Sequence, residues 1–278
     1  MIESPGQVLK RHGLWARKSW GQNFLVAPHV HAAIVAASGA APGVRVVEIG
    51  AGVGTLTAHL VATGAEVWAI ERDRDLCTVL RAELGDTVRL FEADAVTFDY
   101  ASASDEAHPR PAIVGNLPYH LTGPLLFALL EADARTGDWI VMVQKEVAQR
   151  IVAPPGSRTY GGLSVVLGHG RALEWITAVP PGAFLPPPKV DSAVIRLRPL
   201  PAVRGEVGDV RAFRALVRAA FQQRRKTIAN ALSVLADRPS VLRWCEAAGI
   251  DPGVRPEKLA VEQFAALQRA REEGSTHA

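Results

Sequence analysis

Short apolar runs and helical patterns alternate over the first half of the chain. The runs that fit buried strands cover residues 44–49, 67–70, 88–92 and 113–114. Helical patterns follow the first, second and fourth of these runs, over residues 55–62, 76–84 and 125–131. Strands that alternate with helices predict a parallel, doubly wound α/β sheet.

The pattern changes after Pro199 and Pro201. The remaining chain carries helical patterns without intervening strands, over residues 210–235, 241–248 and 261–271. We therefore expect two domains, an α/β domain over residues 1–200 and a smaller, all-helical domain over residues 201–278.

Composition narrows the class of protein. Of the 278 residues, 48% are hydrophobic and 21% are charged, as in ordinary soluble globular proteins. No apolar run reaches the roughly 18 residues of a membrane span, so we expect a cytoplasmic protein. Cys77 and Cys245 are the only cysteines and form no CxxC pair, which argues against a disulfide framework and a zinc site.

Each predicted strand ends at a residue that suits ligand binding. In doubly wound sheets the ligand lies beyond the carboxyl ends of the strands. The residues at or just after these ends are Gly50, Glu71, Asp94 and Asn116. We therefore expect these four positions to converge on one crevice.

A glycine-rich loop, "EIGAGVGTLT", follows the first strand over residues 48–57. Gly50, Gly52 and Gly54 let the backbone turn sharply and approach a ligand closely. The dinucleotide fingerprint G-x-G-x-x-G requires glycine where this chain has Thr55, which argues against NAD. The alternative interpretation is a tight strand-to-helix turn.

Two carboxylates at the next strand ends point to an adenosyl ligand. Glu71 can accept both ribose hydroxyls, and Asp94 can accept the exocyclic amine of adenine. The alternatives are a solvated carboxylate beside Arg72 for Glu71 and a helix N-cap for Asp94. An adenosyl group without a pyrophosphate motif indicates S-adenosylmethionine.

The tetrapeptide Asn116-Leu117-Pro118-Tyr119 directly follows the fourth strand. An adenine amine is a weak nucleophile because its lone pair is delocalised into the ring. The side-chain oxygen of Asn116 and the carbonyl of Leu117 can each accept one of its N–H groups, and Pro118 keeps that carbonyl out of a helix. Tyr119 offers a ring for base stacking. The alternative is a proline turn with a packed tyrosine.

Blocks along nearly the whole chain resemble the small-subunit ribosomal RNA adenine dimethyltransferases. They are "KSWGQNFL", "VEIGAGVGTLT", "NLPY", "QKEVAQRIVA", "YGGLSV", "FLPPPKVDSAVIRL" and "FQQRRKTIANAL". The resemblance implies a Rossmann-like methyltransferase domain and transfer of methyl groups from S-adenosylmethionine to N6 of two adjacent adenosines, in a hairpin loop near the 3′ end of small-subunit RNA. It also implies an immature small ribosomal subunit as partner and a role in its biogenesis. We expect a monomer without a metal.

The resemblance also assigns residues outside the strand ends. Asn23 and Leu25 match the N-terminal part of the family's cofactor site. Phe184 is similar to the aromatic residue that closes over the target base opposite the tyrosine. Its alternative role is a core anchor for the following prolines. His120 and Gly123 depart from the usual family residues and affect the shape of the base pocket.

Basic residues gather in two segments, although the net charge is only +3. Arg224, Arg225 and Lys226 are consecutive, and on a helix they spread over an arc of about 200° that can bind phosphates. The alternative is a solvated helix face. Basic residues between positions 10 and 18 can form a second positive surface for a structured RNA.

Two other functions compete with small-subunit methylation. One is the related large-subunit RNA adenine methyltransferase that confers antibiotic resistance. Leu117, the prolines after Phe184 and the basic segment that begins at Arg224 favour the small-subunit enzyme. The other is a ribosome-assembly or RNA-binding factor that does not need catalysis, which the intact Glu71 and Asp94 argue against.

Overall fold

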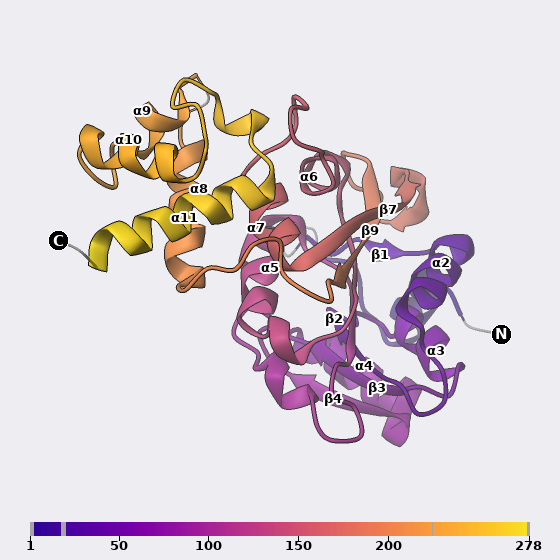
Figure 1. Cartoon of the computed structure of the whole chain (residues 1–278). Helices are drawn as coiled ribbons and strands as arrows, with labels where there is room; N and C mark the ends of the chain where they lie inside the picture. The colour runs from indigo at the N-terminus through magenta and orange to yellow at the C-terminus, as the bar shows by residue number, and fades with distance from the viewer. Residues whose placement is uncertain (1–2, 18–20, 224, 277–278) are drawn as a thin grey trace. The chain divides into compact units, whose positions relative to one another are not determined.

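The computed structural model describes residues 3–17, 21–223 and 225–276. The chain forms two compact units (Figure 1). The first, the α/β unit, comprises residues 1–148 and 174–198, and the second, the helical unit, comprises residues 149–173 and 199–278.

A seven-stranded sheet forms the centre of the α/β unit, with the strand order β4-β3-β2-β5-β6-β9-β7. The strands are β2 (Arg45–Ile49), β3 (Glu66–Glu71), β4 (Val88–Glu92), β5 (Ala112–Asn116), β6 (Trp139–Gln144), β7 (Arg171–Val179) and β9 (Ser192–Pro199). Strands β2 to β6 pair in parallel, and β9 is antiparallel to β6. The predicted strands β2, β3, β4 and β5 are confirmed, whereas β6, β7 and β9 were not predicted.

The register of the parallel strands brings their carboxyl ends together. Ile49 at the end of β2 pairs with Ile70 of β3 on one side and with Gly115 of β5 on the other. Glu71 pairs with Glu92 of β4. The polar residues that follow these strands therefore emerge at one edge of the sheet, as predicted.

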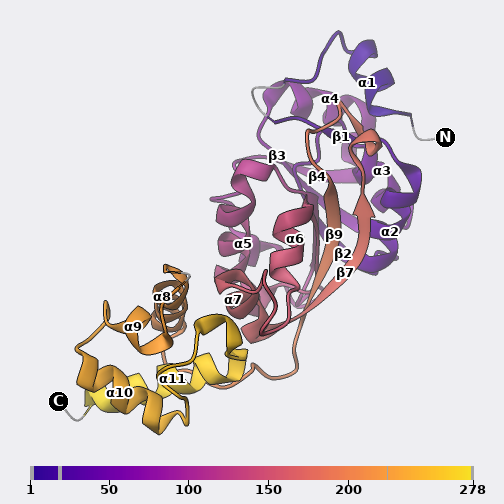
Figure 2. The ribbon, with the colours of Figure 1, turned by 90° about the horizontal axis from the view of Figure 1, so that it is seen from above.

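Helices cover both faces of this sheet. The helices around it are α1 (Pro5–Arg11), α2 (Pro28–Ser38), α3 (Thr55–Val61), α4 (Arg74–Leu84), α5 (Thr122–Glu131) and α6 (Lys145–Ile151), of which α1 packs against α4. Figure 2 shows α5 on one side of the sheet and α2 and α3 on the other. Val30 and Ile34 of α2 and Leu60 of α3 are fully or almost fully buried in one cluster with Val46 and Val114 of the sheet. This packing fixes α2 and α3 beside the ends of β2 and β5.

A two-stranded sheet, β1 (Phe24–Leu25) with β8 (Phe184–Leu185), joins distant parts of the chain. In its antiparallel register Leu25 lies opposite Phe184. Single 3₁₀ turns complete the chain: η2 (Gly85–Thr87), η3 (Tyr100–Ala103), η4 (Tyr119–Leu121), η5 (Asp133–Arg135), η6 (Pro181–Ala183) and η7 (Pro256–Lys258).

The helical unit contains α7 (Gly162–Gly170), α8 (Val210–Phe221), α9 (Ile228–Leu232), α10 (Arg238–Ala247) and α11 (Val261–Thr276). Residues 149–173, which we expected in the first domain, belong here because α7 packs against α8 and α11. Phe221 links these helices, with its ring centroid 6.1 Å from that of Tyr160 and 5.6 Å from that of Phe264.

The continuous helix expected over residues 210–235 is wrong. Helix α8 ends at Phe221 and α9 begins at Ile228, so a turn separates them. Thr227 is the N-cap of α9, and its Oγ1 accepts a hydrogen bond from the Asn230 N–H at 3.4 Å. Because a cap residue has extended backbone geometry, the helix pattern on either side cannot run through it.

Within the described residues, none of the helices has the length and apolar character that crossing a membrane requires. In the same part of the chain, His, Cys, Asp and Glu side chains form no group of three or more that could hold a metal ion.

Candidate active site

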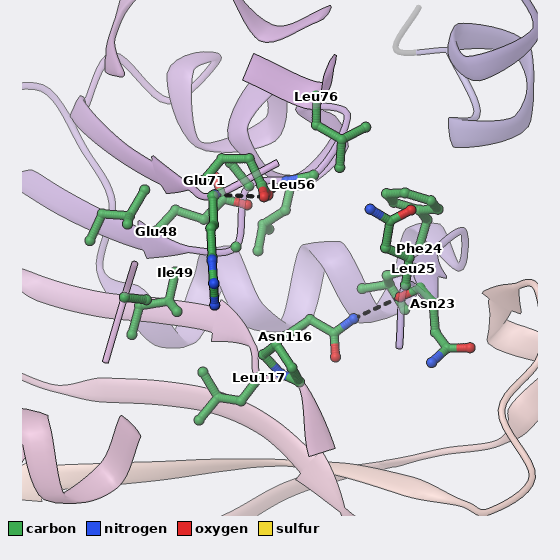
Figure 3. Close-up of a pocket in the computed structure, with 18 of the residues that line it drawn as sticks. Asn23, Phe24, Leu25, Glu48, Ile49, Leu56, Glu71, Leu76, Asn116 and Leu117 are labelled. Atoms are coloured by element: carbon green, nitrogen blue, oxygen red, sulfur yellow. Dashed lines mark hydrogen bonds between the residues drawn. The ribbon is translucent and has the colours of Figure 1, made fainter. Parts of the chain in front are cut away.

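A cavity of about 400 Å³ lies beyond the carboxyl ends of β2, β3, β4 and β5 (Figure 3). Its wall consists of the glycine loop, the strand-end residues, the tetrapeptide and the segment before α2. The predicted residues that line it are Asn23, Leu25, Gly50, Gly52, Glu71, Asp94, Asn116, Leu117, Pro118 and Tyr119. The structure thus brings together every predicted cofactor residue and all predicted catalytic residues except Phe184.

The glycine loop needs its glycines for backbone geometry. Gly50, Gly52 and Gly54 have φ values of 70°, 62° and 85°, which side-chain-bearing residues rarely adopt. At Gly52 a Cβ atom would also lie 3.1 Å from the ring of Phe24. The loop is therefore built to bring its backbone and Phe24 close together at the cavity wall.

The carboxylate of Glu71 accepts hydrogen bonds from three backbone N–H groups. Its Oε2 accepts a hydrogen bond from the Gly52 N–H at 2.9 Å, and its Oε1 accepts from the N–H groups of Arg72 and Asp73, each at 2.8 Å. Burial raises the pKa of this carboxyl. A carboxylate has about four acceptor positions, so Oε2 retains a free position that can accept from a ligand hydroxyl, and the contact with both ribose hydroxyls stays a prediction.

Asp94 closes a turn as well as lining the cavity. Its Oδ1 accepts a hydrogen bond from the Val96 N–H at 2.9 Å, and its Oδ2 lies 3.0 Å from Nη1 of Arg72. The next helical turn, η3, begins only at Tyr100, so Asp94 is not a helix N-cap. Its side chain is about one-third exposed, so the carboxylate can meet a ligand at the β4 side.

Asn116 is oriented by one hydrogen bond. Its Nδ2 donates to the backbone oxygen of Asn23 at 2.9 Å (Figure 3). The amide nitrogen is therefore engaged, and Oδ1 is the acceptor that this side chain can offer to a ligand. Asn23 therefore contributes to the site through its backbone carbonyl.

The next two residues of the tetrapeptide hold the backbone in place. The N–H of Leu117 donates to the Met142 carbonyl at 3.0 Å, and the Leu117 side chain is buried. Pro118 is extended, with ψ of 128°. The described residues donate no hydrogen bond to the Leu117 carbonyl oxygen, and its contact with a target amine stays a prediction.

Tyr119 is fixed at its hydroxyl. The phenol oxygen lies 2.7 Å from Oγ of Ser192, which is fully buried on β9. Burial raises the pKa of this hydroxyl, so the ring stays a neutral phenol. An anchored, half-buried ring at the cavity wall suits stacking on a flat group.

Phe184 is not part of the cavity wall. Its side chain is 4% exposed and lies in the same hydrophobic cluster as Leu25, Val30 and Ile34. The pairing of β8 with β1 turns this ring into the core. The burial of Phe184 fits its alternative role as a core anchor, and its contact with a target base stays a prediction.

Several residues of the cavity wall were missed from the sequence, among them Phe24, Glu48 and His31. Phe24 lies within a recognised block, and Glu48 stands at the start of the glycine motif, but neither block shows which side chains face the cavity. His31 belongs to α2, where its position signals only a buried helix face. Burial raises the pKa of Glu48 to about 8 and lowers that of His31 to about 4, so both are neutral at pH 7.

Arg225 and Lys226 lie in the helical unit, in the turn between α8 and α9. Both side chains are exposed. The predicted 200° helical arc is therefore wrong, because these residues are not on a helix. Arg224 lies outside the described residues.

Comparison with known sequences identifies the family. The profile of the ribosomal RNA adenine dimethylases matches residues 13–271 of this chain. The chain belongs to this family. A relative from Anaeromyxobacter sp. (strain K), "Ribosomal RNA small subunit methyltransferase A", is 49% identical over 96% of this chain and 97% of its own length. A protein of the same name from Myxococcus xanthus (strain DK1622) is 44% identical over 97% of this chain and 95% of its own.

Solved structures show the same fold. The 23S rRNA methyltransferase ErmE has a TM-score of 0.69 and 26% identity, over 90% of this chain and all of that one. A dimethyladenosine transferase from Plasmodium falciparum has a TM-score of 0.69 and 23% identity, over 88% of this chain and 95% of that one. The family and these folds confirm a Rossmann-like methyltransferase sheet with a smaller helical C-terminal region, and an S-adenosylmethionine-dependent methyltransferase.

Proposed function

We propose that this protein transfers methyl groups from S-adenosylmethionine to N6 of two adjacent adenosines, in a hairpin loop near the 3′ end of small-subunit ribosomal RNA. It acts in the cytoplasm as a monomer, on an immature small subunit whose biogenesis it assists. The names of relatives at 44–49% identity support the small subunit as its target.

One observation carries the proposal: the strand order matches the order of groups in adenosylmethionine. Strands β4, β3, β2 and β5 are neighbours in the sheet. They present, in turn, Asp94 for adenine, Glu71 for ribose, the glycine loop, and Asn116 for the amine that receives the methyl. The loop's left-handed glycines and the open acceptor position of Glu71 are features that suit an adenosyl ligand.

Adenosylmethionine, when bound, supplies the methyl group. The protein's part is to hold the target amine: Oδ1 of Asn116 and the carbonyl of Leu117 each accept one of its N–H groups. These acceptors favour the nitrogen geometry in which the lone pair points at the donor. The hydrogen bonds from Asn116 Nδ2 to the Asn23 carbonyl and from the Leu117 N–H to the Met142 carbonyl support this assignment, because they engage the donor groups and leave the acceptors. After methylation the nitrogen is acidic enough to lose its proton to water. Tyr119 stacks on the base.

The helical unit carries the positive charge of the chain, which supports RNA binding there. Its sequence contains sixteen lysines and arginines against nine aspartates and glutamates, a net charge of +7, whereas the α/β unit has fifteen against nineteen, a net charge of −4. Exposed Arg225 and Lys226 lie beside the segment that carries Arg255, because the Ile228 N–H donates to the Val254 carbonyl at 2.7 Å. We propose this surface as the site of phosphate contacts.

The proposal is tested with labelled adenosylmethionine and purified subunits. The protein is incubated with immature small subunits and, separately, with large-subunit RNA, and methylated nucleosides are mapped in both. We expect two adjacent dimethyladenosines near the 3′ end of the small-subunit RNA. Methylation of the large-subunit RNA alone would establish the ErmE-like activity instead, and binding without methylation would establish an assembly factor.

A further inference from the structure

The tetrapeptide that follows β5 is attached to two other strands of the sheet. The Leu117 N–H donates to the Met142 carbonyl of β6 at 3.0 Å. The Tyr119 hydroxyl lies 2.7 Å from Oγ of Ser192, the first residue of β9. The first contact holds the backbone that carries the proposed acceptors, and the second holds the proposed stacking ring.

The register of the sheet joins these two attachment points. Asn116 pairs with Met142 across β5 and β6. Gln144, two residues further along β6, pairs with Ser192 of β9. Because strand pairing fixes the spacing of the paired residues, the two attachment points keep a constant separation.

Ser192 is a rigid partner for the Tyr119 hydroxyl. It is fully buried, and within the part of the chain that the structure describes its Oγ has no other hydrogen-bond partner. The residue before it is also fixed: the Asp191 carbonyl accepts from the Lys145 N–H at 2.9 Å, and Oδ2 of Asp191 lies 3.2 Å from Nζ of Lys145. A buried hydroxyl is nearly always hydrogen-bonded, so this serine is committed to the tyrosine.

The hydrogen bond restricts how the ring of Tyr119 can move. A tyrosine side chain swings about χ1 among three staggered positions. The backbone end of Tyr119 is held in η4, where the Leu121 N–H donates to the Pro118 carbonyl at 2.9 Å. The bond to Ser192 holds the opposite end, so the long axis of the ring keeps one direction.

We propose that Ser192 is a positioning residue for methyl transfer. By holding the Tyr119 hydroxyl, it sets the ring on which the target base stacks, so that the amine of the base reaches Oδ1 of Asn116 and the Leu117 carbonyl. This inference rests on the proposed function. Ser192 is not among the described residues that line the cavity, so it acts through Tyr119 and contacts neither the cofactor nor the base. Small displacements of a reacting group slow a reaction strongly, so the rate depends on this bond more than binding does.

Three variants remove the bond and keep the rest of the site. Ser192→Ala removes one hydroxyl, Tyr119→Phe removes the other and retains the ring, and the double variant removes both. Ser38→Ala is the matched control, because Ser38 is a buried serine at the end of α2 whose Oγ donates to the Val35 carbonyl at 2.7 Å. Single-turnover methylation of immature small subunits, at saturating adenosylmethionine and subunit, gives the rate of transfer.

We expect the rate to fall about tenfold in Ser192→Ala and in Tyr119→Phe. The double variant should be no slower than either, because both single changes remove the same bond. The dissociation constants of adenosylmethionine and of the subunit should stay close to the wild-type values in all three variants. Ser38→Ala should keep the wild-type rate.

Tyrosine NMR reports the contact itself. The chain has three tyrosines, so ¹³C labelling of the ring gives three Cζ signals, and that of Tyr119 is identified by its absence in Tyr119→Phe. In Ser192→Ala we expect the Tyr119 signal to shift and those of Tyr100 and Tyr160 to stay in place. A general loss of structure would move all three.

A wild-type rate in Ser192→Ala, or losses that multiply in the double variant, would overturn the positioning role. An equal loss in Ser38→Ala, or an unshifted Tyr119 signal in Ser192→Ala, would overturn it as well. If the wild type methylates no adenosine, the proposed function is wrong and this inference is rejected with it. An active wild type with an unaffected Ser192→Ala variant rejects this inference alone.

Discussion

At the scale of single residues, Asn116 shows how one hydrogen bond prepares a catalytic atom. Its amide nitrogen donates a hydrogen bond to the backbone oxygen of Asn23, so the side-chain oxygen is the acceptor that remains. Acceptors that are oriented before the reaction act mainly at the transition state. The position of Asn116 after a strand predicted this role, but its partner lies 93 positions away in sequence and carries no local signal.

We expect Asn116→Ala to lower the rate of methyl transfer at least about a hundredfold, and to change binding of the small subunit little. Single-turnover methylation and filter binding measure the two quantities. Asn23→Ala keeps the backbone oxygen that Asn116 contacts, so at saturating adenosylmethionine its rate should stay within a few-fold of the wild type. Equal losses of rate and binding in Asn116→Ala would make this residue structural.

Glu48 makes the stability of the ligand-free protein depend on pH. Burial raises its pKa from 4.5 to about 8, so the native state keeps a proton that the unfolded chain has lost above about pH 5. This carboxyl therefore destabilises the native state increasingly as the pH rises from about 5 to 8. Glu48→Gln should remove that dependence and stabilise the protein at pH 8 by about 2–4 kcal/mol.

Thermal and urea unfolding of the two proteins between pH 5 and 9 measure this difference. We expect the variant and the wild type to be similar at pH 5 and to diverge as the pH rises. A constant difference across the range would mean that Glu48 is ionised in the native state. The sequence could place Glu48 before the glycine loop, but its burial depends on the packing of α2 and α3 against the sheet.

At the scale of elements, strands β2 to β5 were predictable, whereas β6, β7, β9 and the pairing of β1 with β8 were not. Alternating apolar runs identify β2 to β5 because strand periodicity is local. Phe184 was assigned to the base pocket only by its resemblance to an aromatic residue of the family. Its burial comes from Leu25, about 160 positions earlier, which lies opposite it. A local pattern cannot contain such a contact.

We expect Phe184→Ala to lower the free energy of unfolding by about 3–5 kcal/mol, because it leaves a cavity in the core. Phe184→Leu keeps most of the apolar volume and should cost less than about 1.5 kcal/mol while methyl transfer continues. Urea unfolding and the methylation assay give both values. A Phe184→Leu protein that is as stable as the wild type but has lost methyl transfer would return this ring to the base pocket.

At the scale of the whole molecule, the two units differ in net charge, and the cavity lies in only one of them. The cavity belongs to the α/β unit, whose net charge is −4, and the helical unit has a net charge of +7. The overall charge of +3 conceals this difference. The hydrophobic pattern of the sequence predicted a helical region after Pro201. It did not predict that residues 149–173 pack with this region, because α7 contacts α8 and α11 only in the folded structure.

The last prediction concerns Arg225 and Lys226, which are exposed in the turn between α8 and α9. If both side chains contact phosphates, replacing them with alanine should weaken binding to the small subunit and lower the slope of log K against log salt by about 2. Binding of adenosylmethionine should not change, since its proposed site lies in the other unit. A triple variant that includes Arg224 should extend the same trend.

A matched control is Arg110→Ala with Arg135→Ala, which removes two exposed positive charges from the α/β unit. This control separates a specific contact from a general loss of attraction, because both double variants change the net charge equally. Salt titrations of subunit binding compare them directly. If both lower the slope by the same amount, the effect is only net charge. If the Arg225 and Lys226 variant keeps the wild-type slope, the turn is a solvated surface, and the RNA is positioned by other basic residues of the helical unit, such as Arg255.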